Sequence, residues 1–485
     1  MKRYVISVDQ STSASKAFLV DDSGTIVRRA SLPHGQSYPA PGRVEHDAAE
    51  IWHNVETIIE QVSEGLDTAE IAAVSISNQR ETTVVWDAAT GEPVCPAIVW
   101  QDVRGEFICR ELAEHASIIH QKTGLTLSPY FPAAKLCALF REQPELLKRA
   151  EKGELRLGTI DSYLVFRMSG GNHVTDTTNA SRTQLMNLES LSWDEELLTL
   201  FNIPRCTMPR EILPSDSIFG FYQGIPITGV LGDSHAALFG QGCHDSGMAK
   251  ATYGTGSSVM MNTGDRPVIS QLGLSTSVAF SVKGRTSYAL EGNVTCSGDT
   301  LVWLCDTLGM FENPAQIEAL AATVEDAQGV NLIPAFAGLG APHFDSDARA
   351  ILCGMSRGTS KGHIAYAALA SIAQQDADIL EIMQQESGKR MTCLFADGGS
   401  TQNSLLMQMQ ADYADCAIRC APASELSALG AAYIAGIRTG VYESFQSIPA
   451  HSAEGQIYHP KMQRSQKEKL RQAWKADVRR ALTTG

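Results

Sequence analysis

The chain has 485 residues, 44% of them hydrophobic, and its 54 acidic and 39 basic side chains give a formal net charge of −15. This profile is typical of a soluble globular protein and excludes a disordered chain or a small disulfide-stapled module. Because single hydrophobic cores stop growing near about 250–300 residues, the length predicts two large lobes.

The acidic excess argues against nucleic acid as a partner, because proteins that hold phosphate backbones rely on clustered Lys and Arg. The N-terminal segment reaches Asp9 after a short apolar run, so it lacks the apolar core of a signal peptide, and no window approaches a membrane span. The cysteines include no CxxC pair. We therefore expect a cytoplasmic protein with reduced thiols that binds neither nucleic acid nor membrane.

The first segment predicts three consecutive strands, because apolar runs at residues 3–9, 16–22 and 25–32 are separated by turn-forming residues. Helical patterns at residues 47–62, 144–151 and 193–201 follow, interleaved with short apolar strands such as the one at residues 71–77. Alternating strands and helices indicate an α/β fold.

The glycine-rich and serine-rich strand pattern returns at residues 249–294, which predicts a second, related lobe. Before it, residues 224–243 are typical of a strand, a loop that carries Asp233 and a helix, and we place the lobe boundary between residues 242 and 243. An amphipathic helix is expected near the C-terminus, over residues 463–482.

The first turn is the first candidate site. Asp9 is followed by Ser11, Thr12, Ser13 and Lys16, and a tight hairpin of hydroxyl residues with one cation can bind phosphate. An ordinary polar turn is the alternative. The sequence contains no GxxxxGK[ST] loop, so a P-loop is excluded.

Three glycine clusters in the second half, at residues 252–256, 338–340 and 397–399, form the second candidate. The last is followed by an expected helix start at residues 400–403, which would aim free N–H groups at an anion or a ring system. A tight connection between a strand and a helix is the alternative.

Arg80 and Glu81 end an apolar strand and form the third candidate. Charged groups at a strand end in α/β folds commonly face the ligand crevice, although a surface ion pair is the alternative. Trp100, Tyr130 and Asp233 would add a flat apolar wall, a phenol and a carboxylate, which suit a polyhydroxylated substrate. Their spacing alone leaves open whether they converge.

These residues resemble the FGGY carbohydrate kinases over nearly the whole chain, and most of all the members that phosphorylate glycerol. The resemblance is carried by YPAPGRVEHDAAEIW, SNQRETTVVWD, AIVWQDVR, VTDTTNASRTQLMN, GMAKATYGTGSSVMMNTG, YALEG and PAFAGLGAPHFD. It implies two ribonuclease H-like (actin/hexokinase-like) lobes, residues 1–242 and 243–485, with ATP and Mg²⁺ in a cleft between them. It also implies a homo-oligomer, either a dimer or a tetramer.

The resemblance implies a role for each candidate residue. Asp233 would be the catalytic base, and Asp9 would hold Mg²⁺ through water. The substrate hydroxyls and carbons would contact Arg80, Glu81, Trp100, Tyr130 and Asp233. The phosphates and the nucleoside would contact Ser11, Thr12, Ser13, Lys16, Thr255, Gly298, Gly399 and Asn403.

The chain departs from that family pattern at the substrate pocket. Ser234 stands where these kinases carry Gln, and Ser258 stands where they carry a bulky Phe. The resemblance implies glycerol or a closely related small polyol as the substrate. Because both changes would enlarge the pocket and admit water, a four- or five-carbon polyol or ketose is the alternative. His235 and His343 are interpreted as structural histidines. A catalytically silent binding protein on the same fold is a further alternative.

Overall fold

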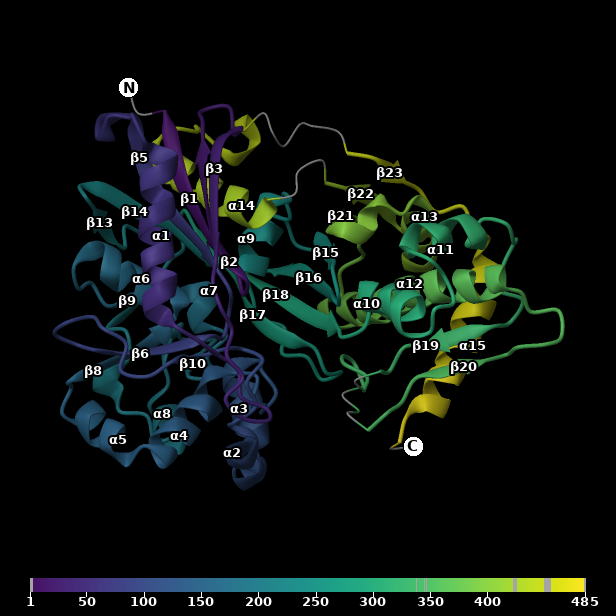
Figure 1. The fold of residues 1–485 in the computed structure, drawn as a ribbon, viewed down its shortest axis with the longest axis horizontal. Coiled ribbons are helices and arrows are strands. Elements are labelled where there is room, and N and C mark those ends of the chain that lie inside the picture. Colours follow the sequence, from purple (N-terminus) through teal and green to yellow (C-terminus); the bar gives the residue numbers. More distant parts are fainter. Residues whose placement is uncertain are drawn as a thin grey trace.

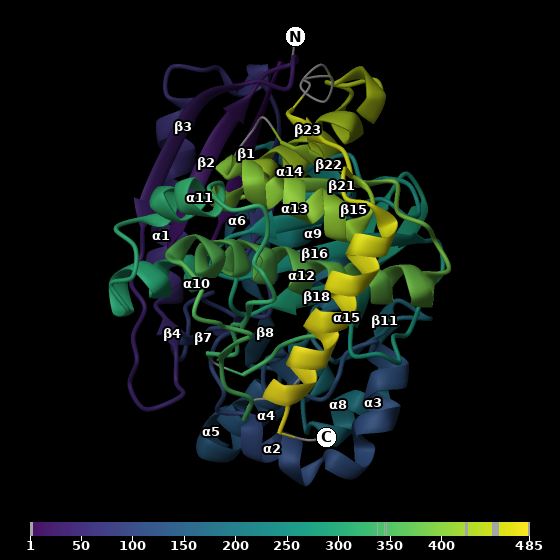
Figure 2. The same cartoon turned by 90° about the vertical axis from the view of Figure 1, so that its right-hand side faces the viewer.

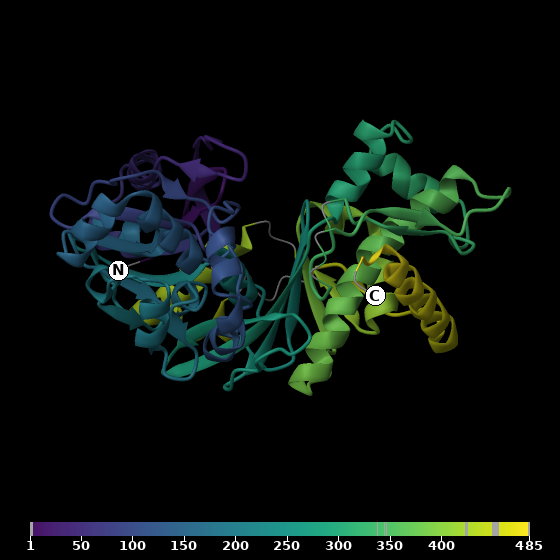
Figure 3. The same cartoon turned by 90° about the horizontal axis from the view of Figure 1, so that it is seen from below.

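The computed structural model describes residues 3–336, 338–343, 345, 347–421, 425–448 and 455–483. Figure 1 shows two lobes side by side, with the N-terminal elements in purple to teal and the C-terminal elements in green to yellow. Seen from below, the strands of the second sheet reach from the C-terminal lobe toward the N-terminal lobe (Figure 3).

The first lobe is built on a six-stranded sheet in the order β13-β14-β5-β1-β2-β3. The three expected consecutive strands are confirmed, and they pair antiparallel, whereas β5 is parallel to β1 and β14 is parallel to β5. The strands are β1 (Tyr4–Gln10), β2 (Ala14–Val20), β3 (Ile26–Pro33), β5 (Ile71–Asn78), β13 (Gly220–Tyr222) and β14 (Ile225–Gly232).

The second lobe repeats this arrangement in a seven-stranded sheet, β17-β18-β16-β15-β21-β22-β23. Here β15, β16 and β18 form the antiparallel set, and β21 and β22 continue it in parallel. The strands are β15 (Ala249–Tyr253), β16 (Ser257–Gly264), β17 (Ser275–Val282), β18 (Arg285–Val294), β21 (Cys393–Asp397), β22 (Ala417–Cys420) and β23 (Ile457–Tyr458). Both lobes are therefore ribonuclease H-like, as the resemblance implied.

Helices cover both faces of the first sheet. Ile6 and Val8 of β1 pack with α1 (Ala48–Ser63), while Val5 on the opposite face packs with α14 (Leu426–Thr439). Asp47 accepts the N–H groups of residues 49 and 50, which caps α1. The hydroxyl of Ser7 donates to the carbonyl of Ala428 at 2.7 Å, so a helix from the end of the chain completes the first lobe.

The lower part of the first lobe contains a four-stranded sheet, β4-β7-β6-β8, and several short helices. The predicted helices are found with small shifts: residues 144–151 are helical as expected, and the helix near residue 193 begins two residues later. The elements are β4 (Glu45–His46), β6 (Thr83–Asp87), β7 (Ala97–Ile98), β8 (Leu155–Thr159), α2 (Glu106–Glu111), α3 (Ala116–Thr123), α4 (Pro132–Glu142), α5 (Pro144–Glu151), α6 (Ile160–Ser169), β9 (Val174–Asp176), α7 (Thr177–Ala180), β10 (Met186–Asn187), β11 (Ser192–Trp193), α8 (Glu195–Leu200) and β12 (Glu211–Leu213).

The expected C-terminal helix is α15 (Arg464–Ala481), which crosses the outer side of the second lobe (Figure 2). All eleven cysteines are free thiols. None of the helices in the described part of the chain has the length and apolar content needed to cross a bilayer. The remaining elements are α9 (Asp233–Gly240), α10 (Gly298–Val302), α11 (Pro314–Ala321), β19 (Asn331–Ile333), β20 (Ile351–Cys353), α12 (Lys361–Ser387) and α13 (Ser404–Ala414).

Candidate active site

The turn between β1 and β2 carries the predicted phosphate residues. The Ser11 hydroxyl donates to the carbonyl of Ala14 at 2.9 Å and closes the turn, while Thr12 and Ser13 stand at its tip. Lys16 lies directly opposite Asp9 in the strand register, so both side chains are on one face of the hairpin. This placement puts a cation and a carboxylate beside the hydroxyl-rich turn.

Asp9 is buried and hydrogen bonded. Its Oδ1 accepts the hydroxyl of Ser77 at 2.8 Å. Burial raises the pKa of Asp9 to about 6, Ser77 and Lys16 oppose that rise, and the negative charge of Asp233 adds to it. A carboxylate that is crowded by a second carboxylate favours a nearby cation.

The parallel strands β5 and β14 bring two predicted acceptor residues together. Arg80 follows β5 and Asp233 follows β14, and their Nε and Oδ1 atoms are 3.3 Å apart. The chain bends at Glu81, which has a φ of +59°, so Arg80 and Glu81 do not simply point to opposite faces. Asp233 is the accessible member, with 36% of its side chain exposed.

Trp100 and Tyr130 form an aromatic wall whose ring centroids are 5.7 Å apart, in an edge arrangement. The Trp100 indole N–H also donates to the Thr12 hydroxyl at 3.0 Å, which joins the wall to the phosphate turn. Lys135 supports the wall from behind: its Nζ donates to the carbonyls of Trp100 at 2.9 Å and Tyr130 at 2.6 Å. Burial lowers the pKa of Lys135 to about 7.

In the second lobe, three glycine-containing segments meet. The N–H of Gly298 donates to the carbonyl of Gly254 at 3.0 Å. A Cβ on Gly298 would lie 2.6 Å from that oxygen and 3.3 Å from Ser400 Oγ, so only glycine fits. Thr255 lies on the same turn as Gly254, and a Cβ on Gly399 would point into open space. Asn403 caps α13 through its Oδ1, at 2.8 Å from the N–H of residue 406, which leaves its amide N–H₂ as a donor.

A row of polar residues crosses the face of the second sheet that looks toward the first lobe. Asp397, Thr252, Ser258 and Asn293 are successive partners in the strand register. Alternate residues such as Ala251 point to the opposite face, into the core of the second lobe. The hydroxyl of Ser258 is buried and has no hydrogen-bond partner among the described residues.

The two predicted pocket serines are not tied to the other candidates. The N–H of Ser234 donates to Asp233 at 2.6 Å, but in the described part of the chain neither serine hydroxyl bonds another predicted residue. His235 is fully buried, and its Nε2 lies 3.0 Å from the hydroxyl of Ser277, in agreement with a structural role. His343 lies in the C-terminal lobe, in a small cavity lined also by Asp378.

The buried charged residues that the sequence patterns did not reveal include Lys135, Arg182, Lys250 and Glu291. Arg182 forms ion pairs with Glu81 and Glu291. The available signal was a charge inside an apolar stretch, as in YALEG, because a buried charge requires a partner. In a sequence pattern such a residue looks the same as an exposed position in a strand, so the pattern gives no sign of its partner across the fold.

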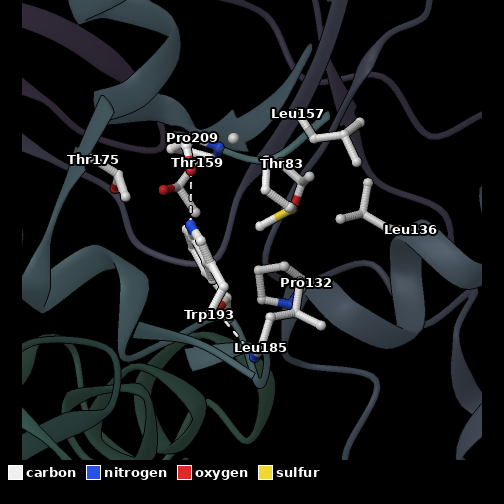
Figure 4. Close-up of a pocket in the computed structure, with 12 residues that line it drawn as sticks. Thr83, Pro132, Leu136, Leu157, Thr159, Thr175, Leu185, Trp193 and Pro209 are labelled. Carbon is white, nitrogen blue, oxygen red and sulfur yellow. Dashed lines mark hydrogen bonds between the residues drawn. The ribbon is translucent and has the colours of Figure 1, made fainter. Parts of the chain in front are cut away.

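A small cavity lies behind this region rather than in it. Thr83, Pro132, Leu157 and Trp193 contribute to its walls, and none of the predicted site residues lines it (Figure 4). Trp193 donates its indole N–H to the carbonyl of Pro209 at 2.8 Å. The cavity therefore lies apart from the predicted site residues, in the interior of the first lobe.

Two ribonuclease H-like lobes with a hydroxyl-rich turn, glycine-rich turns and an accessible carboxylate define a phosphotransferase of the actin/hexokinase type. Family models match both halves: the N-terminal domain of the FGGY family of carbohydrate kinases over residues 4–240 and its C-terminal domain over residues 249–439. The chain belongs to this family and is an ATP-dependent carbohydrate kinase.

Individual relatives match along their whole length. The chain is 45% identical to a glycerol kinase of Trichlorobacter lovleyi, over 99% of this chain and 98% of the relative. It is 43% identical to a glycerol kinase of Deinococcus radiodurans, over 99% and 97%. Among solved structures it is similar to Plasmodium falciparum glycerol kinase with ADP, with a TM-score of 0.94, 34% identity and 99% coverage of both chains.

Proposed function

We propose that the enzyme transfers the γ-phosphoryl group of ATP to a terminal hydroxyl of glycerol or a closely related small polyol. The observation that carries this proposal is the pairing of the accessible Asp233 carboxylate with Arg80, next to the buried Asp9 of the phosphate turn. The full-length similarity to glycerol kinases supports the choice of acceptor.

In the first step the acceptor is oriented. Glu81 and Arg80 would bind its hydroxyls, and Trp100 would lie against its carbon atoms with the Tyr130 phenol beside it. Burial raises the pKa of Tyr130, so this phenol remains a hydrogen-bond donor at neutral pH. Asp233 would accept the proton of the terminal hydroxyl as its oxygen attacks the γ-phosphorus, and the bond from that phosphorus to the β-phosphate oxygen breaks to release ADP.

The nucleotide would lie between the hydroxyl-rich turn and the second lobe. Ser11, Thr12, Ser13 and Lys16 would contact the phosphates from the first lobe, while Thr255, Gly298, Gly399 and Asn403 would hold the phosphates and nucleoside from the second. The glycine positions suit this role, because a Cβ on Gly399 would enter open space and one on Gly298 would collide with the turn.

The residues present also fit Mg²⁺ held through water. Among the described residues no group of three or more His, Cys, Asp or Glu side chains could hold a metal directly. Asp9 is a single carboxylate whose pKa is raised to about 6 by burial, with Asp233 adding to the rise, and a hydrated cation would relieve that crowding. When bound, the metal neutralises charge on the transferred phosphoryl group.

One observation favours a second acceptor class. Ser258 and Ser234 offer hydroxyls in place of the larger side chains typical of the family, and the Ser258 hydroxyl is buried without a partner in the described part of the chain. A four- or five-carbon polyol or ketose would supply an additional hydroxyl to bind there. This is the alternative substrate.

An assay of ADP release tests both proposed substrates. Purified protein with Mg²⁺ and ATP is given glycerol, erythritol, pentitols or ketopentoses, with a control that lacks acceptor. Highest kcat/KM on glycerol supports the first proposal. A preference of tenfold or more for a longer acceptor, about 1.4 kcal/mol of transition-state stabilisation, supports the second. Both proposed substrates would be contradicted if ADP release did not depend on any acceptor, or if it persisted in Asp233→Ala.

We further propose the lobe division 1–242 and 243–485, a homo-oligomeric state and a cytoplasmic location. The family-model boundaries at residues 240 and 249 support the division, although α14, which comes after residue 243, packs against the face of the first sheet at Val5. The use of ATP supports the location. Size-exclusion chromatography with light scattering measures the oligomeric state directly.

A further inference from the structure

An alternating chain of five charged side chains runs beneath the acceptor residues, and we call it the charge chain. Glu81 Oε1 is 2.6 Å from Arg182 Nε, and Arg182 Nη1 is 2.8 Å from Glu291 Oε2. Glu291 then binds Arg80 through both carboxylate oxygens, at 2.7 and 3.0 Å. Arg80 Nε completes the chain at 3.3 Å from Asp233. Its order is Glu81, Arg182, Glu291, Arg80 and Asp233.

The charge chain opens toward solvent at one end only. The exposed fractions of the side chains are 2% for Glu81, 1% for Arg182, 0% for Glu291 and 7% for Arg80, against 36% for Asp233. Pairing with an opposite charge offsets the cost of burying a charge, and each inner member has an opposite charge on both sides. The geometry of the buried members is therefore fixed by their neighbours.

Glu291 determines how Arg80 is presented. A guanidinium has five N–H donors; in Arg80 one on each terminal nitrogen bonds Glu291, and Nε lies 3.3 Å from Asp233 as an ion pair. Two N–H groups remain for an acceptor hydroxyl, in a direction set by the paired contact to Glu291. Burial alone would raise the pKa of Glu291, but Arg182 and Arg80 hold that pKa below its ordinary range, so the residue stays charged.

Arg182 fixes the orientation of Glu81, as Glu291 fixes that of Arg80. It holds Glu81, whose backbone has the left-handed φ of +59° that a glutamate rarely adopts. Its guanidinium also lies over the ring of Phe131, 5.2 Å from the centroid, directly after Tyr130 in the chain. One arginine thus contacts two of the segments that carry acceptor residues.

Glu291 belongs to the sheet of the second lobe. It lies in β18 opposite Met260 of β16, and Gly298 follows a few residues after this strand. His235 packs beneath Arg80; burial, aided by the charge of Arg80, lowers the pKa of this histidine far below its usual value, so it adds no competing charge. The second lobe therefore supplies a residue that orients acceptor groups of the first.

We propose that Glu291 and Arg182 are positioning residues for the acceptor: neither touches it, and together they set the orientation of Arg80 and Glu81. This inference rests on the proposed function, since it assigns a role within the same site. It predicts that loss of either residue weakens acceptor use and leaves nucleotide binding intact, because their contacts lie on the acceptor side.

The test compares Glu291→Gln, Arg182→Met, Arg182→Lys and the double variant Glu291→Gln/Arg182→Met with wild type, using its best acceptor. We expect Glu291→Gln and Arg182→Met to raise the acceptor KM at least tenfold, with ADP affinity by calorimetry changed less than twofold. Arg182→Lys keeps the positive charge but lacks the planar guanidinium that can bond two partners at once. Its acceptor KM should therefore lie between those of wild type and Arg182→Met. The double variant should be little worse than the poorer single variant, because both act through one chain.

The matched control is Glu381→Gln, which breaks an ion pair to Arg471 at 3.0 Å on the outer side of the second lobe. It should lower thermal stability without raising the acceptor KM. Two results would overturn the inference and leave the proposed function standing. One is an unchanged acceptor KM in Glu291→Gln, and the other is a KM increase in the double variant equal to the product of the two single-variant increases. Wild-type protein without acceptor-dependent ADP release overturns the proposed function and the inference with it.

Discussion

The indole N–H of Trp100 donates a hydrogen bond of 3.0 Å to the hydroxyl of Thr12. The first residue belongs to the proposed acceptor wall and the second to the proposed phosphate turn. The two substrates of the reaction would therefore meet at side chains that are already bonded to each other. Through this hydrogen bond, a change at the acceptor wall can alter the position of the phosphate turn, and the reverse also holds.

Trp100→Phe keeps an aromatic wall and removes that hydrogen bond. We expect the KM values for both ATP and acceptor to rise about three- to tenfold, since a hydrogen bond of this kind contributes about 0.5–1.5 kcal/mol. Steady-state kinetics with each substrate varied in turn measures both values. The control is Trp52→Phe, which should change neither KM. Trp52 lies on α1, and Arg167 of α6 lies over its ring. Equal effects of the two substitutions would refute this account.

Lys135→Met should raise the acceptor KM about tenfold and leave the KM for ATP within twofold. Lys135 Nζ donates to the carbonyls of both Trp100 and Tyr130, and methionine would leave these two oxygens without their donor. Kinetics and thermal melting report the change. Lys148→Met, at an exposed ion pair on α5, is the matched control. A variant that melts at a lower temperature but binds acceptor normally would show that Lys135 is only structural.

Asp9→Asn should abolish Mg²⁺-dependent turnover and yet stabilise the metal-free protein at neutral pH. The folded pKa of Asp9 is about 6, above its ordinary 3.8, so the folded chain binds more protons between these values. Its contribution to stability is complete below pH 3.8 and is lost as the pH rises through 6.

Urea unfolding with chelator should therefore give Asp9→Asn an advantage of roughly 2–3 kcal/mol at pH 7.5 that shrinks toward pH 4. Adding Mg²⁺ should stabilise wild type and not the variant. Asp22→Asn, an exposed neighbour at the other end of β2, controls for the loss of one negative charge. An advantage independent of pH would contradict the assigned cause.

Gly398→Ala should lower ADP affinity at least tenfold. Gly398 has a φ of +93°, and a Cβ there would lie 2.3 Å from the carbonyl oxygen of Tyr253, so the turn before Gly399 must move. Gly388→Ala is a matched control because Gly388 also has a positive φ, +65°, but a Cβ would meet nothing within 4 Å. Calorimetric titration with ADP compares the two. Similar affinity losses would mean that backbone strain, and not the collision, is responsible.

Local patterns predicted the elements of this fold well. The strands around Asp9, the helix after Asp233 and the repeated glycine-rich hairpins were all visible, because periodicity and turn chemistry act over a few residues. The order of the second sheet was not visible. There β18 and not β17 lies beside β16, and nothing within a single strand specifies that choice.

The candidate site was predictable where residues sit at strand ends and hidden where charges are buried. Arg80 and Asp233 follow neighbouring parallel strands, so their meeting could be anticipated once the sheet was known. Glu291 is 211 positions from Arg80 and becomes its partner only through packing between lobes. The left-handed backbone of Glu81 was equally hidden, because a glutamate gives no sign of it in the sequence.

The position of α14 has a consequence for biosynthesis. This helix is encoded near the end of the chain, yet it covers Val5 and its neighbours on the first sheet, and Ser7 bonds Ala428 across 421 positions. When the first half of the chain has been synthesised, the face of the first sheet that carries Val5 is still exposed, because α14 has not yet been made. The nascent chain must keep that face from aggregating until translation is almost complete, so a truncated product should depend on chaperones that the full chain no longer needs.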